Sequence, residues 1–313
     1  MPAFANASDV DTHASDAAPH GVAFTDPRSR FAQPPFENQG DIDMTGETDE
    51  MTPKPDHGES SYRGQDRLRD RVAVVTGADS GIGRAIALAY AREGADVVIN
   101  YLDEHDDAEA TADLVRSAGR KPLVEPADLR EREAAEGLIE RAVDTFGRLD
   151  LLVNNAAYQE TRESVDEMEP ELFDRIFKTN VYAPFWLSRA ALPHMKPGSG
   201  IINTVSIQAY QPSGMLLPYA STKSALTGMT KALAKLAIER GVRVNAVAPG
   251  PVWTPLIPGS MPPEQVKKFG SSTVIGRPAQ PAELAPLYVW LASAEASYVT
   301  GEVFGATGGS SPL

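Results

Sequence analysis

Short apolar runs alternate with longer amphipathic stretches along the chain from about residue 70 onward. The short runs are typical of parallel strands that are buried on both faces. They predict strands at Arg71–Thr76, Asp96–Tyr101, Lys121–Pro126, Leu149–Asn154, Gly200–Val205, Val242–Ala248 and Glu302–Ala306. The longer stretches predict helices at Ile82–Glu93, Ala108–Ala118, Glu131–Phe146, Pro170–Met195, Tyr219–Glu239 and Ala282–Ser293. This alternation indicates an α/β fold with a single doubly wound, Rossmann-type parallel sheet of about seven strands.

Residues 1–65 lack this alternation and are rich in Asp, Ala, Pro, Gly and His. Such a composition is typical either of a disordered tail or of an extended arm, and both interpretations stay open. Scattered large apolar residues are candidates to anchor an arm on the fold or on a neighbouring subunit: Phe24, Phe31, Phe36, Met51 and Tyr62. We therefore expect an N-terminal arm over residues 1–65 and one folded domain over residues 66–313.

Composition narrows the possible partners. The chain has a formal net charge of −14 and no cysteine, which excludes disulfides and thiolate chemistry. An acidic surface argues against nucleic acid and anionic membranes as partners. No apolar run approaches the roughly 20 residues that span a bilayer, and no signal peptide is visible, so we expect a cytoplasmic protein. The five histidines are scattered without ligand spacing, so we assign no catalytic metal.

A glycine-rich turn follows the first predicted strand and opens the first predicted helix. After Thr76 it runs through Gly77, Ala78, Asp79, Ser80, Gly81, Ile82 and Gly83. Unpaired N–H groups and the helix dipole favour a phosphate at such a helix start, and bare glycine backbone lets a pyrophosphate approach closely. The turn therefore predicts a dinucleotide-phosphate site, although glycine-rich turns also occur as plain connections.

Four further residues are candidates for chemistry. Tyr219 and Lys223 are four apart on a predicted helix, so they share a face. Ser206 follows the carboxyl end of a predicted strand, where open α/β sheets bind ligands. Asn180 lies in the helix before that strand. Taken singly, each residue is equally compatible with a structural role as strand end, core aromatic, solvated lysine or helix-kink amide.

Three other segments complete a recognisable set. Asp128-Leu129 follows the third strand, Asn154-Asn155-Ala156-Ala157 follows the fourth, and Pro249-Gly250-Pro251-Val252-Trp253-Thr254 follows the sixth. With the glycine turn and the four candidates, they resemble the short-chain dehydrogenase/reductase family over residues 68–309. The subgroup of NADP(H)-dependent aldehyde reductases and general stress proteins is the most similar, because it shares Met51–Pro55 in the arm and Ser206–Ser213.

The resemblance implies a dinucleotide-binding catalytic domain that transfers a hydride between NADP(H) and a carbonyl or alcohol substrate. Tyr219 is then the general acid/base, Ser206 positions the substrate oxygen, and Asn180 holds a water that relays protons to Lys223. A cation about 4 Å from Tyr219 would lower its pKa by roughly three units, and Lys223 would supply it. The implied cofactor contacts are Gly77, Asp79, Ser80, Gly81, Ile82, Gly83, Asn100, Tyr101, Asp128, Leu129, Asn154, Ala156, Tyr219, Lys223, Pro249, Gly250, Val252 and Thr254.

The choice of cofactor depends on the end of the second strand. An acid there binds the ribose of NAD and repels a 2′-phosphate, but Asn100-Tyr101 are neutral. NADP(H) is therefore favoured, with Arg84 and Ser80 as candidate phosphate ligands, and NAD(H) stays possible. The alternatives are an NAD(H)-using polyol, glucose or 3-oxoacyl dehydrogenase and a non-catalytic redox sensor.

Two further expectations concern the surroundings of the site. Trp253, Tyr158, Tyr210 and Met215 are either packing or substrate-pocket walls, and Pro255–Gly276 is either a lid or a plain loop. The helical stretches Pro170–Met195 and Tyr219–Glu239 carry apolar residues outside the single stripe that would face the sheet. A second apolar face needs a partner, which favours a homotetramer, or else a dimer. These residues are Phe173, Ile176, Phe177, Val181 and Phe185, and then Leu226, Met229, Leu233 and Leu236.

Overall fold

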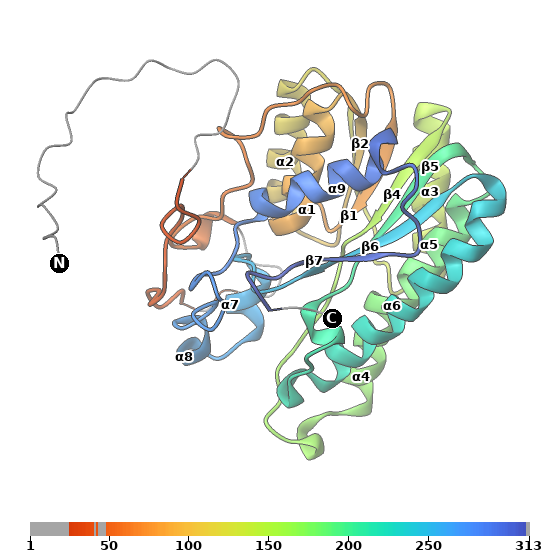
Figure 1. Ribbon diagram of the computed structural model, residues 1–313. Helices are drawn as coiled ribbons and strands as arrows, with labels where there is room; N and C mark the ends of the chain where they lie inside the picture. Colours follow the sequence, from red (N-terminus) through yellow and green to blue (C-terminus); the bar gives the residue numbers. More distant parts are fainter. Residues whose placement is uncertain (1–24, 41, 43–47, 311–313) are drawn as a thin grey trace, which may run out of the picture.

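The computed structural model describes residues 25–40, 42 and 48–310. Within them, seven strands form one sheet in which all neighbours are parallel, in the order β3-β2-β1-β4-β5-β6-β7 (Figure 1). The strands are β1 (Val72–Thr76), β2 (Asp96–Tyr101), β3 (Pro122–Pro126), β4 (Leu149–Asn154), β5 (Met195–Thr204), β6 (Arg243–Pro249) and β7 (Val303–Ala306). The strand order reverses between β1 and β4, as in doubly wound sheets, so the predicted fold class is confirmed.

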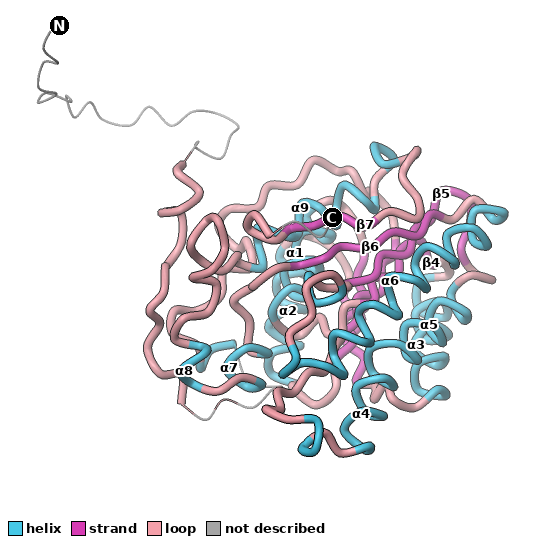
Figure 2. Tube along the Cα trace, turned by 60° about the horizontal axis from the view of Figure 1, so that its bottom comes forward, coloured by secondary structure: helices cyan, strands magenta, loops and turns pink. Residues whose placement is uncertain are grey.

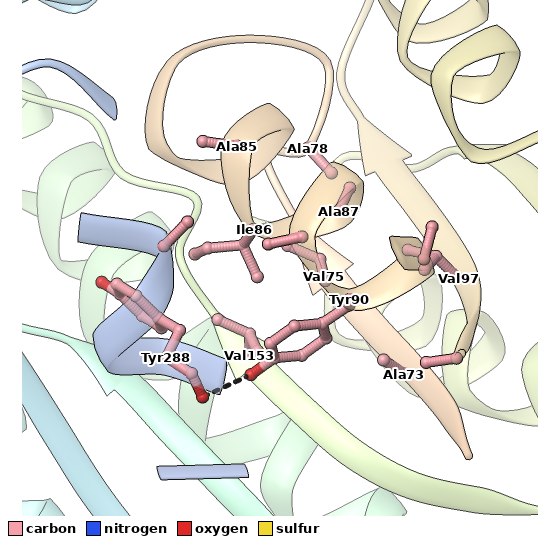
Figure 3. Packing of buried hydrophobic residues seen from close by; sticks show 14 of the residues in the cluster. Ala73, Val75, Ala78, Ala85, Ile86, Ala87, Tyr90, Val97, Val153 and Tyr288 are labelled. Atoms are coloured by element: carbon pink, nitrogen blue, oxygen red, sulfur yellow. Dashed lines mark hydrogen bonds between the residues drawn. The ribbon is translucent and has the colours of Figure 1, made fainter. Parts of the chain in front are cut away.

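Helices cover both faces of this sheet. One face carries α1 (Gly81–Arg92), α2 (His105–Ser117) and α9 (Pro281–Ala292), and the other carries α3 (Arg132–Phe146), α5 (Ala183–Ala191) and α6 (Leu217–Ala237). Because side chains alternate along a strand, Val75 of β1 packs on the first face and Val74 on the second. Figure 3 shows the first face, where the Tyr90 hydroxyl donates to the main-chain oxygen of Tyr288 at 3.1 Å.

The predicted helix Pro170–Met195 is wrong as a single element. The structure has α4 (Pro170–Phe177), a π-helical turn (Lys178–Tyr182) and then α5, which ends at Ala191. Pro193 cannot continue a helix, and Met195 already begins β5. The amphipathic pattern runs through the π-helical turn, so periodicity alone does not reveal it.

The described part of the arm lies along the outside of the fold (Figure 1). It includes a short 3-10 helix, Thr48–Glu50, and then passes the start of α9, where the Asp56 main-chain oxygen accepts from Ala282 N at 2.9 Å. Of the expected anchors, Phe36 and Met51 are buried, Phe31 and Tyr62 are half-buried, and Phe24 lies outside the described residues. The domain boundary at residue 65 stays a prediction.

The segment Pro255–Gly276 contains two short helices that the sequence did not predict. They are α7 (Leu256–Ser260) and α8 (Pro263–Val266), which lie among loop segments at the side of the molecule where the arm runs (Figure 2). Across the described chain, no helix combines the length and the apolar character that a membrane crossing would require.

Candidate active site

A cavity of about 320 Å³ opens at the carboxyl ends of the central strands. Its wall contains most of the predicted site residues: Gly77, Asp79, Ser80, Gly81, Ile82, Asn100, Tyr101, Asp128, Leu129, Ala156, Ser206, Tyr219, Lys223, Pro249, Gly250, Val252 and Thr254. Three predicted residues do not line it, namely Gly83, Asn154 and Asn180. The glycine turn after β1, Ser206 after β5 and the side chains of Tyr219 and Lys223 on the helix Leu217–Ala237 therefore share one hollow.

The glycine turn forms a bare backbone cradle. Gly77 and Gly81 have φ of +59° and +50°, which side chains rarely adopt. A Cβ on Gly83 would lie only 1.8 Å from the Gly77 carbonyl oxygen, so Gly83 serves close packing below the turn. No side chain caps the start of α1 at Ser80, which leaves its first N–H groups to the cavity. This donor set fits the pyrophosphate of a dinucleotide.

Tyr219 is placed by the first turn of α6 and lies deep in the cavity wall. Its side chain is 8% exposed, and the hydroxyl of Ser206, which follows β5, hydrogen-bonds to it. Burial raises the pKa of Tyr219 to about 12, and the Ser206 hydrogen bond opposes that shift only in part. The phenol therefore keeps its proton at neutral pH.

Lys223 lies one turn further along α6 and is 1% exposed. Its Nζ donates to the Thr204 main-chain oxygen at 2.7 Å and lies 5.3 Å from the centre of the Tyr219 ring. Burial lowers the pKa of Lys223 to about 7. Burial of both groups disfavours both charges, so the pKa of Tyr219 is raised in this structure, and the expectation that Lys223 favours the Tyr219 phenolate stays a prediction.

Asn180 and Asn154 act within the protein framework. Asn180 Oδ1 accepts from Tyr158 N at 2.8 Å, and its Nδ2 donates to Tyr158 O at 2.9 Å and to Thr222 Oγ1 at 3.1 Å. Asn154 Nδ2 donates to Asn203 Oδ1 at 2.8 Å, between β4 and β5. Asn180 thus fixes the loop after β4 and Asn154 joins two strands, and the water relay through Asn180 stays a prediction.

The ribose end of the cavity differs from the expectation in one respect. Arg84 is buried and pairs with Asp107 at 2.9 Å, while its Nε donates to the Asp79 main-chain oxygen at 2.7 Å. The expected role of Arg84 as a phosphate ligand is therefore wrong, because its guanidinium lies behind the turn. Asn100 Nδ2 donates to Glu125 O at 3.2 Å, which joins β2 to β3. Burial raises the pKa of Asp79 to about 6.

Comparison with known proteins agrees with this geometry. The family described as Enoyl-(Acyl carrier protein) reductase matches residues 77–311, well over half of the chain. A Burkholderia cenocepacia short chain dehydrogenase solved in complex with NADP is 31% identical, with a TM-score of 0.74 over 78% of this chain and 99% of that chain. The chain belongs to the short-chain dehydrogenase/reductase family. It is an NAD(P)-dependent oxidoreductase of that family.

Curated relatives of this short-chain dehydrogenase/reductase are more similar still. General stress protein 39 of Bacillus subtilis is 47% identical over 83% of this chain and 91% of that protein. NADPH-dependent aldehyde reductase 1, chloroplastic, of Arabidopsis thaliana is 42% identical over 87% and 97%, and glucose and ribitol dehydrogenase of Daucus carota is 42% identical over 88% and 96%. The last two matches are too long to fit within residues 66–313, so they include part of the arm.

Several cavity residues of this short-chain dehydrogenase/reductase were not predicted. They are Leu102, Glu104, Arg130, Gln159, Arg175, Ile207, Gln208, Leu216, Ile257, Met261 and Phe269. The sequence could have indicated Arg130, because it lies only two residues after Asp128. In the structure its Nε donates to the Asp128 carboxylate at 2.8 Å. Ile257 and Phe269 belong to Pro255–Gly276, which was expected to be either a lid or a plain loop, but only the tertiary fold shows that these two residues and Gln159 reach the cavity.

Of the four residues expected either to pack or to form pocket walls, only Tyr158 is a wall of the cavity. Tyr158 lines the cavity and stacks with the Arg175 guanidinium at 4.0 Å from its ring centre. Trp253 is fully buried outside the cavity, and neither Tyr210 nor Met215 lines it. Among the described residues, no group of three or more His, Asp or Glu side chains is placed to hold a metal ion.

Proposed function

We propose that this protein reduces the carbonyl group of an aldehyde or ketone with NADP(H), or oxidises the corresponding alcohol. One observation carries the proposal: the protonated phenol of Tyr219, with Ser206 beside it and Lys223 behind it, shares a cavity with the glycine cradle. A binding protein needs the cradle but not a buried tyrosine and lysine of shifted pKa, which argues against the non-catalytic redox sensor.

The residues divide the chemistry between them. A bound nicotinamide cofactor would supply or accept the hydride, with its pyrophosphate on the turn from Gly77 to Gly81 and its adenine beside Asp128-Leu129. Ser206 would hydrogen-bond the substrate oxygen and orient it. Tyr219 would give its proton to that oxygen as negative charge develops there. Lys223 would make this proton easier to release, because its ammonium form favours the phenolate.

The preference for NADP(H) is part of the proposal. It is supported by the neutral Asn100-Tyr101 pair and by the names of relatives that bind or use NADP or NADPH. NAD(H) is the second candidate, because Arg84 is turned away from the cavity while Asp79 lines it. The corresponding alternative reaction is a polyol or glucose dehydrogenase, as in the name of the carrot relative.

A substrate and cofactor panel tests the proposal. Purified protein is assayed with NADPH and NADH in parallel against aldehydes, ketones and sugars, and kcat/KM is compared. We expect turnover of simple aldehydes with NADPH. Turnover of sugars or polyols with NAD(H) alone would favour the dehydrogenase alternative, and cofactor binding without any turnover would favour the redox sensor.

Asp79 provides a matched variant for the cofactor choice. Asp79→Asn removes a carboxylate from the ribose end but keeps its size, so kcat/KM with NADPH is expected to rise about tenfold relative to NADH. An unchanged ratio would show that Asp79 does not face the 2′-position of the ribose.

We also propose a homotetramer, or else a dimer, in the cytoplasm, with a small carbonyl or alcohol substrate and neither nucleic acid nor a membrane as partner. Phe173, Tyr182, Phe185 and Leu236 are exposed apolar side chains on α4, the π-helical turn, α5 and α6. Ile176 and Leu226, which were expected to contribute, are buried in the subunit instead. Light scattering at micromolar concentration tests the assembly, and a stable monomer would refute it.

A further inference from the structure

The arm contacts the segment after β6 through a small apolar cluster, which we call the clasp and which consists of Phe36, Met51, Pro53 and Trp253. The Trp253 ring is fully buried and stacks on Phe36 with 4.2 Å between ring centres. Its Nε1 donates to the Pro53 main-chain oxygen at 2.7 Å, and Met51 is 1% exposed in the same cluster. The arm therefore supplies both the stacking partner and the hydrogen-bond acceptor of the indole.

The segment Pro255–Gly276, which we call the lid, lies directly against the clasp. Phe36 N donates to Lys267 O at 3.0 Å, so the backbone of the arm is also tied to the lid. Ile257, Met261 and Phe269 pack against the clasp cluster and also line the active-site cavity. One layer of lid side chains thus separates the arm from the space in front of Tyr219.

On its other side the lid is tied to the loop after β4. Gln159 Nε2 donates to Ser260 Oγ at 2.7 Å, and Thr161 Oγ1 donates to Ser260 O at 3.0 Å. The helices α7 and α8 have only five and four residues, which is too short for independent stability. The position of the lid therefore depends on contacts to the catalytic body, which also include Ile275 N donating to Gly308 O at 3.2 Å, and on contacts to the arm.

We propose that Phe36 and Met51 of the arm are positioning residues, which set the shape of the substrate pocket by holding the lid closed through Trp253. This inference rests on the proposed carbonyl reduction, and it assigns the arm a role in substrate affinity and not in cofactor binding. The reason is spatial, because Ile257, Met261 and Phe269 touch the clasp and line the cavity, whereas the glycine cradle is built from β1 and α1.

Phe36→Ala tests the proposal, with Leu68→Ala as the matched control. Both remove a large buried apolar side chain, but Leu68 packs on the face of α1 and α9, away from the lid. Phe36→Ala should raise the substrate KM about tenfold with kcat and cofactor Kd within a few-fold. Leu68→Ala should lower thermal stability without that change in KM, and Phe36→Leu should restore much of the affinity.

Limited trypsin digestion provides a readout that needs no turnover. Lys267 and Lys268 are exposed on the lid, and cleavage there requires local opening of the backbone. Phe36→Ala should speed this cleavage several-fold at a temperature where Leu68→Ala does not. Equal cleavage and equal KM in the two variants would overturn the proposal. If the wild type turns over no carbonyl, the proposed function fails, while the cleavage rates still decide whether the arm holds the lid.

Discussion

The two ends of the active-site cavity are built in opposite ways. At the cofactor end, the glycine cradle comes from one continuous stretch, in which β1, the glycine turn and α1 follow one another between Val72 and Arg92. The substrate end is assembled from the lid, the loop after β4 and an arm whose hydrogen bond from Trp253 to Pro53 spans 200 residues of sequence. The glycine cradle therefore depends on local backbone geometry, and the substrate end depends on contacts between distant segments.

Tyr219 lies where the two ends meet, and its replacement should have the largest effect. Tyr219→Phe removes only the transferable proton, so kcat should fall by about 10² to 10⁴, the usual contribution of a general acid. The ring still fills its place, so cofactor affinity, followed by nucleotide fluorescence, should stay within a few-fold of wild type. Wild-type turnover in this variant would exclude Tyr219 as the acid.

A change at Gly83 should damage the cofactor end alone. The added Cβ of Gly83→Ala would lie 1.8 Å from the Gly77 oxygen, so the turn must move by about 1 Å or more, a displacement that can cost about 10²-fold in function. We expect weaker cofactor binding by titration, with unchanged trypsin cleavage of the lid. Gly137→Ala in α3 is the control, because its Cβ meets only the end of the Arg141 side chain. Wild-type affinity in Gly83→Ala would contradict close packing of this turn.

Removal of the arm should damage the substrate end. Deletion of residues 1–60 takes away the buried Phe36 and Met51 and leaves Trp253 Nε1 without its acceptor. Large buried side chains are worth several kcal/mol, so the melting temperature should fall by about 10 °C. The sheet should stay folded by circular dichroism. If the melting temperature does not change, the arm is only a tail.

The smallest expected effect concerns the charge of Lys223. Its pKa in the folded protein, about 7, is below the ordinary 10.5, so the unfolded chain binds more protons between these two values. Folding stability of the wild type should therefore rise with pH across this window, by at most about 1.4 kcal/mol per pH unit. Lys223→Met should be more stable than wild type near pH 7, by roughly 2 kcal/mol, since loss of the bond to Thr204 O offsets part of the gain.

Urea unfolding at pH 7 and pH 9 measures this difference. The advantage of Lys223→Met should shrink as pH rises from 7 toward 10.5, because the proton that Lys223 binds in the unfolded chain is then worth progressively less. A difference that is the same at both pH values would show that Lys223 stays charged in the fold.

The contrast between local geometry and contacts of distant segments also explains which features could be predicted from the sequence. The bounds of β2 and β4 were predicted to the residue, because fully buried strands need continuous apolar runs. The placement of the glycine turn followed from its own residues. The orientation of Arg84 was missed, since its partner Asp107 lies on another helix, and the pKa of Tyr219 was missed because burial is set by the whole fold. The segment Pro255–Gly276 was named as a lid or a plain loop, but which of its residues reach the cavity could not be predicted for the same reason.

The clasp also has a consequence for the order of folding. Arm residues such as Phe36 and Met51 leave the ribosome first, but Trp253 and the lid are synthesised about two hundred residues later. Contacts of such long sequence separation carry a high loop-closure cost and form late. The apolar side chains of the arm therefore stay without their packing partners during most of synthesis. The acidic residues around them help to keep this nascent segment from aggregating. Closure of the substrate pocket would then be among the last events of maturation, after the cofactor cradle has formed.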